Sequence, residues 1–337
     1  MALLDVSGLK VNLHTARGQV QAVRGLDFSL ERGETLGIVG ESGCGKSMTA
    51  LALMGLLPDN AQAVGRIGLH GQNLLEMNEA KLAALRGDRM AMIFQEPMTS
   101  LNPLHRIGEQ IAEPLRLHRK MTPRQARERA LDLLDRVGIP NPSQRIDAYP
   151  HQLSGGQRQR VMIAMALACE PDILVADEPT TALDVTIQGQ ILDLIGRLVD
   201  ESGMALILIS HDLGVIAETV DRVLVMYAGR AVEHGPVQDV FARMAHPYTR
   251  GLFAAMPRLH EGMAAWPRPA LPTIAGIVPD LHDLADHGCA FAPRCSLADA
   301  RCGQQTPPNT NLGADLGNDH GAACWHTEKT LAEKIGG

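Results

Sequence analysis

Aromatic side chains are scarce in this sequence, at 3% of its 337 residues, and positive charge does not prevail, since the net charge is −7. Nucleic-acid-binding proteins usually carry a basic excess and stacking aromatics, so the composition argues against that class. The N-terminus lacks a basic segment followed by an apolar one, and the apolar stretch Val161–Cys169 is far shorter than the roughly 20 residues of a membrane-spanning helix. We therefore expect a cytosolic protein without a signal peptide or a membrane span, held at a membrane, if at all, by partners.

The composition changes near Met256. Five prolines lie in Met256–Pro279, and four of the six cysteines follow. We expect residues 1–255 to form one large α/β domain and residues 256–337 to form a small extension behind a proline-rich linker. In a cytosolic chain, grouped cysteines predict a metal site before disulfides. The grouped cysteines are Cys289, Cys295, Cys302 and Cys324, whereas Cys44 and Cys169 are isolated.

Short apolar runs alternate with helical patterns in the large domain. We expect helices over Ser47–Leu57, ended by Pro58, and over Thr186–Glu201, and Thr122-Pro123 marks the start of a third in a helix-rich region. Apolar runs of four to eight residues are typical of buried strands, so the alternation predicts a mainly parallel sheet built from βαβ units. The expected strands are Leu9–Leu13, Ala22–Leu30, Leu36–Gly40, Met90–Phe94, Ile173–Ala176 and Ala205–Ile209.

Residues 40–47, GESGCGKS, fit the phosphate-loop pattern G-x-x-x-x-G-K-[ST] between an apolar strand and a helix. Glycines let backbone N–H groups turn toward phosphate oxygens, and the positive end of the following helix faces the anion. Lys46 places a charge at the β and γ phosphates, and Ser47 offers its hydroxyl to Mg²⁺. A glycine-rich surface turn is the alternative, which the flanking strand and helix disfavour. The residues expected to contact the nucleotide are Gly40, Ser42, Gly43, Gly45, Lys46, Ser47 and Met48.

Two further strands end in residues suited to nucleotide hydrolysis. Asp177 and Glu178 follow the strand Ile173–Ala176, and His211 follows the next apolar strand. A Mg²⁺ ion bound by Ser47 needs a carboxylate partner, which Asp177 can supply. Glu178 can orient or deprotonate the attacking water, and His211 can contact a γ-phosphate. An acidic strand end facing solvent is the alternative, but the phosphate loop in the same chain favours the catalytic interpretation.

The segment Leu153-Ser154-Gly155-Gly156-Gln157 resembles the signature motif of ABC ATPases, the subunits that supply energy to ABC transporters. Its serine can cap the following helix, while its glycines let the backbone approach a phosphate. The likeness continues in the order of that family and covers roughly residues 3–255. The other matching motifs are Gln95 for the Q-loop glutamine, Ala182-Leu183-Asp184 for the D-loop and His211 for the switch histidine.

The resemblance implies an α/β phosphate-loop NTPase cassette with a mainly parallel sheet, an N-terminal antiparallel β subdomain, a helical signature subdomain at about residues 100–170 and a small cysteine-rich extension. It implies ATP and Mg²⁺ as ligands, with ATP enclosed between two cassettes arranged head to tail. In that arrangement Glu178, His211 and Gln95 act in hydrolysis, and Ser47, Gln95 and Asp177 hold Mg²⁺. The nucleotide of the facing cassette is then contacted by Ser154, Gly155, Gly156, Gln157 and Asp184.

The sequence departs from the family at the base-binding position. ABC ATPases usually stack adenine on an aromatic side chain near the end of the first strand, but Leu13–Val23 contains no Phe, Tyr or Trp. His14, Arg17 or Val20 could take that place.

The C-terminal part resembles importer ATPases of the oligopeptide/dipeptide/nickel group. His246-Pro247-Tyr248-Thr249 and Pro272–Pro279 match segments found there, and the four-cysteine tail matches as well. The cysteines are separated by five, six and 21 residues, without the tight pair typical of zinc sites. Four thiolates can hold a [4Fe–4S] cluster, which the resemblance favours; zinc and unligated thiols are the alternatives.

The resemblance therefore implies the ATP-hydrolysing subunit of a bacterial importer for di- or oligopeptides, bound peripherally at the cytoplasmic face of the inner membrane. Its implied partners are a homologous second ATPase in a heterodimer, two transmembrane permease subunits and an extracytoplasmic solute-binding protein. Met98–Pro103, directly after Gln95, is the candidate contact with the permeases. The alternatives are import of nickel or another small solute, an ABC ATPase outside transport, and a subunit that binds ATP without hydrolysing it.

Overall fold

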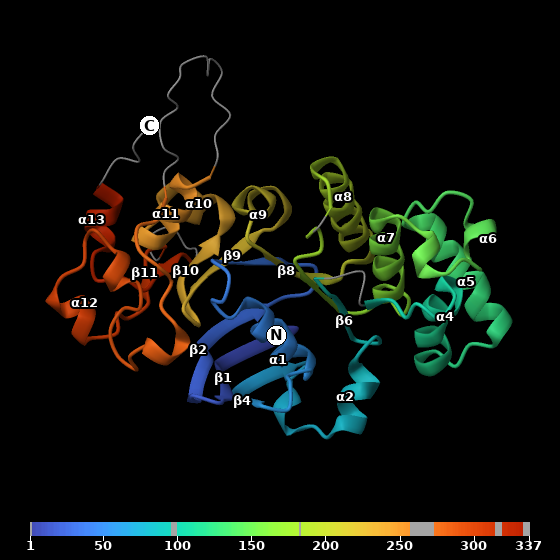
Figure 1. Ribbon diagram of the computed structural model, residues 1–337, viewed down its shortest axis with the longest axis horizontal. Coiled ribbons are helices and arrows are strands. Elements are labelled where there is room, and N and C mark those ends of the chain that lie inside the picture. Colours follow the sequence, from blue (N-terminus) through green and yellow to red (C-terminus); the bar gives the residue numbers. More distant parts are fainter. Residues whose placement is uncertain (1, 96–99, 182, 257–272, 314–318, 333–337) are drawn as a thin grey trace, which may run out of the picture.

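The fold is built on a sheet that combines parallel and antiparallel pairing. The computed structural model describes residues 2–95, 100–181, 183–256, 273–313 and 319–332 (Figure 1). The strand order of this sheet is β11-β12-β10-β9-β3-β8-β7-β6, parallel from β9 to β6 and antiparallel beyond β9. The bounds are β3 Thr35–Val39, β6 Met90–Ile93, β7 Ile173–Asp177, β8 Ala205–Ser210, β9 Arg222–Tyr227, β10 Arg230–Pro236, β11 Thr310–Asn311 and β12 Gly321–Ala322.

The parallel strands are covered on both faces, which explains their continuous apolar sequences. In β7 every residue is buried. Leu174 and Ala176 pack into one hydrophobic cluster with the helical region, while Ile173 and Val175 pack into another with α1 (Lys46–Met54) and the N-terminal strands. This alternation follows from the two-residue period of a strand. The four apolar runs predicted as buried strands are confirmed as β3, β6, β7 and β8.

A second, antiparallel sheet lies beside α1 and has the strand order β2-β1-β4-β5. The prediction that α1 ends at Pro58 is wrong, because the helix ends at Met54. Gly55 adopts the left-handed conformation with φ 62°, and its N–H bonds back to Ala52 and Leu51, which closes the last turn. The bounds are β1 Leu4–Thr15, β2 Gly18–Leu30, β4 Ala61–Leu69 and β5 Gln72–Asn73, so both predicted N-terminal strands are longer than expected.

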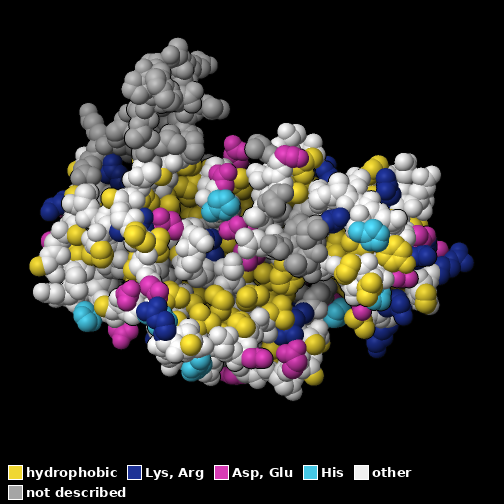
Figure 2. All heavy atoms as spheres, viewed as in Figure 1, with side chains coloured by type: hydrophobic (Ala, Val, Ile, Leu, Met, Phe, Trp, Pro, Cys, Tyr) yellow, Lys and Arg dark blue, Asp and Glu magenta, His cyan; other side chains and the backbone are white. Residues whose placement is uncertain are grey.

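Helices gather at one end of the molecule, drawn in green in Figure 1. The predicted helix start at Thr122 is confirmed, because the Thr122 side chain and Gln125 form a reciprocal capping box around Pro123. The inner face of this helix is apolar, and Figure 2 shows Lys and Arg side chains gathered on the outer margin of the region. The bounds are α2 Glu79–Leu85, α4 Ile107–His118, α5 Pro123–Arg136, α6 Pro142–Arg145, α7 Gly155–Ala166, α8 Val185–Ser202, α9 Leu213–Thr219, α10 Val237–Arg243 and α11 Pro247–Ala254, with 3₁₀ turns η1 Leu74–Glu76 and η2 Pro150–Gln152.

The C-terminal extension joins the central sheet instead of standing apart from it. Its strands β12 and β11 continue the sheet beyond β10. His320 of the extension and Glu233 of β10 are fully buried and lie 3.0 Å apart, so the attachment includes a polar pair inside the protein. Most of the predicted linker, residues 257–272, lies outside the described residues. The remaining elements are η3 Leu281–Asp283, η4 Ala292–Arg294, α12 Ala300–Gln304 and α13 Thr327–Ala332.

Among the described helices, none combines the length and the apolar character that crossing a membrane takes.

Candidate active site

The predicted phosphate loop connects β3 to α1. Gly40 and Gly45 have φ angles of 154° and 101°, which side chains with a Cβ rarely adopt, and a Cβ on Gly45 would lie 2.5 Å from the carbonyl oxygen of Ala22. Lys46 is 5% exposed, and its Nζ donates to the carbonyl oxygens of Gly40 at 2.8 Å and Glu41 at 3.1 Å. The loop therefore curves around its own lysine, directly in front of the N-terminus of α1.

The other predicted residues of the loop differ in exposure. Ser42 and Gly43 are exposed at its tip, whereas Cys44 is buried and Met48 is half-buried against the hydrophobic core. Burial raises the pKa of the Cys44 thiol, which disfavours its reactive thiolate form. The exposed tip leaves backbone N–H groups open to an anion, which is how such loops bind phosphate.

Ser47 and Asp177 form the candidate Mg²⁺ site. The Ser47 Oγ lies 3.2 Å from the Asp177 Oδ1, although the two residues come from α1 and from the end of β7. Asp177 is 4% exposed, and burial raises the pKa of its carboxyl group, an effect that the Ser47 hydrogen bond opposes. Hydroxyl and carboxylate oxygens are ligands that Mg²⁺ prefers, and a cation here would favour the charged carboxylate. The pair therefore fits the ion.

Glu178 is the meeting point of side chains from three strand ends. Its Oε2 accepts from Gln95 Nε2 at 3.1 Å and from Thr181 Oγ1 at 2.9 Å, and it lies 3.4 Å from Nδ1 of His211. The structure thus brings the three predicted catalytic residues together. Glu178 also has a φ of 45°, a left-handed conformation that is costly for a residue other than glycine and that recurs at functional sites.

Three residues beside the site were not predicted from the sequence. Thr181 holds the Glu178 carboxylate as described above, Tyr248 Oη accepts the N–H of Glu41 at 2.8 Å, and Arg294 pairs with the Glu41 side chain. Thr181 could have been predicted from the sequence, because it lies only three residues after Glu178. Tyr248 and Arg294 could not, because their contacts with Glu41 span 207 and 253 residues of sequence and depend on the fold.

The signature segment begins α7. Ser154 caps the helix in a capping box with Gln157: the Gln157 N–H donates to Ser154 Oγ at 3.3 Å, and the Ser154 N–H donates to Gln157 Oε1 at 3.1 Å. Ser154 and Gly155 are exposed, and the segment shares a surface hollow with Leu183 and Asp184. In the described part of the chain, the hydrogen bonds of this segment do not reach the phosphate loop. Ala182 of the predicted D-loop lies outside the described residues.

The candidate base-binding residues lie on the β1–β2 hairpin. His14 and Arg17 are exposed, whereas Val20 is buried. Residues of the extension approach the same hairpin: Asp280 Oδ2 lies 3.4 Å from Arg17 Nη1, and His282 Nε2 lies 3.2 Å from Thr15 Oγ1.

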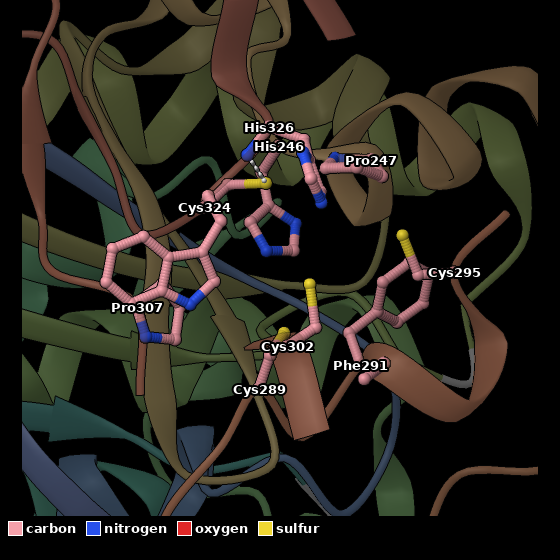
Figure 3. Close-up of a pocket in the computed structure, with 11 residues that line it drawn as sticks. His246, Pro247, Cys289, Phe291, Cys295, Cys302, Pro307, Cys324 and His326 are labelled. Atoms are coloured by element: carbon pink, nitrogen blue, oxygen red, sulfur yellow. Dashed lines mark hydrogen bonds between the residues drawn. The ribbon is translucent and has the colours of Figure 1, made fainter. Parts of the chain in front are cut away.

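The four grouped cysteines line one enclosed pocket with His246 and His326. Figure 3 shows their sulfur atoms turned toward a common space. Burial raises the pKa of the Cys289, Cys302 and Cys324 thiols, that of Cys324 to about 11, so a cation would be needed to keep these three as thiolates. The lining cysteines are Cys289, Cys295, Cys302 and Cys324.

The spacing of these thiols bears on which metal centre they suit. Four thiolates around one zinc ion lie about 3.8 Å apart, given Zn–S bonds of about 2.3 Å. Among the described residues, ligand atoms all within 4.8 Å of one another occur in Asp299, Cys302 and His326, and no three of the thiols are that close. Asp299 is near Cys302 because it caps α12, accepting the Cys302 N–H at 3.1 Å. No three of the described thiols therefore meet the spacing that four thiolates around one zinc ion require.

This fold and this set of residues define a phosphate-loop ATPase of the ABC type. Residues 23–181 match the family model described as ABC transporter, and residues 232–302 match the one described as oligopeptide/dipeptide transporter, C-terminal region. The chain belongs to the ABC transporter ATP-binding proteins and hydrolyses ATP, with Mg²⁺ as the accompanying ion.

Similar proteins are known from several bacteria. A peptide ABC transporter ATP-binding protein of Sinorhizobium fredii is 49% identical over 98% of this chain and 96% of its own length. A peptide import ATP-binding protein of Brucella melitensis is 50% identical over 98% of both chains. Among solved structures, the ATP-binding cassette MJ0796, a dimer bound to ADP and Pi, has a TM-score of 0.62 and 27% identity, covering 69% of this chain and 98% of its own.

Proposed function

We propose that the chain powers an importer that carries peptides of the di- and oligopeptide type across the cytoplasmic membrane. The observation that carries this proposal is that one chain joins an ATP-hydrolysing cassette to a segment similar to the oligopeptide/dipeptide transporter C-terminal region. Relatives 49% and 50% identical along nearly the whole chain bear names that refer to peptide transport, which supports it further. Such an ATPase acts on permeases in the membrane.

Uptake measurements test the cargo. In cells that carry the chain as the only copy of this ATPase, Glu178→Gln is expected to abolish uptake of a labelled dipeptide and to leave nickel uptake unchanged. The reason is that transport needs turnover, which this variant lacks. Loss of nickel uptake alone would favour the nickel importer, and loss of neither would overturn the peptide assignment while leaving the ATPase activity in place.

In the proposed mechanism, residues at the strand ends have separate roles in binding and in hydrolysis. The loop 40–47 holds the phosphates, and Ser47 and Asp177 hold Mg²⁺ with help from Gln95. The ion supplies positive charge that stabilises the charge on the phosphates. Glu178 takes a proton from the attacking water, a role supported by its hydrogen bond from Gln95 and by its position 3.4 Å from His211.

We propose further that ATP is enclosed between this chain and a homologous second ATPase in a heterodimer. The supporting observation is the exposure of Ser154 and Gly155 at the N-terminus of α7, where the hydrogen bonds of Ser154 in the described residues go to Gln157 and not to the phosphate loop. A helix N-terminus with exposed N–H groups suits a phosphate supplied from outside. Gly156, Gln157 and Asp184 border the same hollow.

The permease contact is proposed beside Gln95. A hollow there is lined by Met54, Phe94, Leu117 and Met162, and Phe94 and Leu117 are 39% and 68% exposed. Exposed apolar surface of this kind is typical of protein contacts. Ser100, a residue of the predicted contact segment 98–103, also lines this hollow, and residues 98 and 99 lie outside the described part of the chain.

This arrangement implies a peripheral position at the cytoplasmic face of the inner membrane, with a solute-binding protein on the other side. We propose that residues 1–255 of the chain form the cassette and that residues 256–337 form the extension.

We propose a [4Fe–4S] cluster on Cys289, Cys295, Cys302 and Cys324. The enclosed pocket that the four cysteines line together supports it. Because the pocket fastens a short extension with a small core of its own, the cluster would act as a structural clip. Zinc and unligated thiols are the alternatives.

Elemental analysis tests this assignment. Protein purified without oxygen is expected to contain about four iron and four sulfide per chain, and Cys302→Ser is expected to lower both. Cys169→Ser, a buried cysteine elsewhere in the fold, is the matched control and should change neither. Zinc in place of iron would support the zinc alternative, and absence of iron, sulfide and zinc would leave unligated thiols.

A further inference from the structure

Arg294 of the C-terminal extension reaches the phosphate loop. Its side chain is 4% exposed and forms a two-point ion pair with Glu41, the second residue of that loop. Nη1 lies 2.6 Å from Oε2, and Nη2 lies 3.0 Å from Oε1. Paired geometry of this kind fixes both direction and distance, unlike a single charge contact.

The guanidinium is held on every side. Its Nε donates to the carbonyl oxygen of Ala275 at 2.9 Å, and Nη1 also lies 3.3 Å from the Tyr227 hydroxyl. The Tyr227 and Phe291 rings each have their centroids 5.8 Å from the guanidinium carbon. A buried charge must be fully paired to be tolerated, and here each nitrogen has an acceptor. Arg294 is therefore rigidly placed.

Glu41 connects Arg294 to the residues of the phosphate loop. Its N–H donates to Tyr248 Oη at 2.8 Å, and its carbonyl oxygen accepts from Lys46 Nζ at 3.1 Å. One residue thus links the arginine of the extension to the lysine of the phosphate loop. Because Glu41 adjoins Gly40, a shift of its backbone would change the curve of the loop itself.

On its other side, Arg294 adjoins the thiol pocket. It is the last residue of η4 and directly precedes Cys295, and both Phe291 and Cys295 line that pocket. Arg294 is therefore joined directly through the backbone to a residue of the pocket.

We propose that Arg294 is a positioning residue for ATP binding. It holds Glu41 and thereby the phosphate loop, so that ATP affinity depends on an intact C-terminal extension. The proposal rests on the ATP-binding role proposed above for residues 40–47. A purely structural role of the ion pair is the alternative, in which its loss lowers stability without affecting ATP.

The test compares variants of the full chain in the assembled complex. Arg294→Gln is expected to raise the KM for ATP about tenfold, a typical effect of losing a charge-assisted contact, with a smaller change in kcat. Arg294→Lys keeps the charge without the two-point geometry and should raise KM by only about threefold. Glu41→Gln approaches the pair from the loop side and should match Arg294→Gln, while the double variant should be no worse than either single one.

Arg222→Gln is the matched control. Arg222 also joins the cassette to the extension, pairing with Glu34 at 2.8 Å and Asp319 at 3.4 Å, but it sits at the opposite end of β9 from the phosphate loop. It should leave KM unchanged.

Two outcomes would overturn the proposal: an unchanged KM in Arg294→Gln and Glu41→Gln, or an equal rise in Arg222→Gln. If Arg294→Gln does not fold, Glu41→Gln decides alone. The ATP-binding role of the loop is judged separately by Lys46→Ala, so its failure is distinguishable from failure of the proposal for Arg294.

Discussion

ATP turnover by the complex is expected to fall about 10²- to 10⁴-fold when Glu178 is replaced by glutamine, the range associated with losing a general base. ATP binding should persist, because the amide has the shape of the carboxylate and can still accept from Thr181. Turnover is measured by phosphate release and binding by titration with labelled ATP. With binding intact and hydrolysis blocked, the two ATPase subunits should stay associated when ATP is present, which sedimentation can detect.

The control for this variant is Glu218→Gln, which changes an exposed glutamate on α9. Both the rate and the ATP-dependent association should then remain at wild-type values. Wild-type turnover in Glu178→Gln would remove the assignment of Glu178 as the base and direct attention to His211, 3.4 Å away.

Lys46→Ala is expected to weaken ATP binding about 100-fold, because two charge-assisted contacts to phosphate oxygens are lost at about 1.5 kcal/mol each. The change also removes the donor that now spans the carbonyl groups of Gly40 and Glu41. Binding of labelled ATP measures the effect. Lys10→Ala, which changes an exposed side chain of β1, should bind as the wild type does. Equal affinity in the two variants would contradict the phosphate-loop assignment.

The parallel core was predictable because its signals are local. Strands buried on both faces appear as uninterrupted apolar runs, and a strand such as β7 must end where its first charged residues begin. The capping box at Thr122 and the phosphate-loop pattern likewise lie within a few residues of sequence. The end of α1 was misjudged because two breakers, Gly55 and Pro58, compete there, and the glycine acts first by closing the last turn.

The contacts of the extension could not be predicted, since they join residues distant in sequence. β11 and β12 are two residues each, too short to show an alternating pattern, and they owe their pairing to the edge that β10 offers. In the same way, Arg294 is one arginine among many until the fold places it against Glu41. Glu178 and His211 were predicted from their positions at strand ends, whereas Gln95 was added only through the family resemblance.

The pairing of Glu41 with Arg294 also has a consequence for the order of synthesis. These partners are 253 residues apart, so at about 5–20 residues per second the ribosome makes the second roughly 13–50 s after the first. The nascent cassette therefore has its phosphate loop long before it has the arginine that pairs with it. During that interval an incomplete chain lacks the ion pair that holds its phosphate loop. A premature stop before codon 294 leaves the chain permanently without that ion pair.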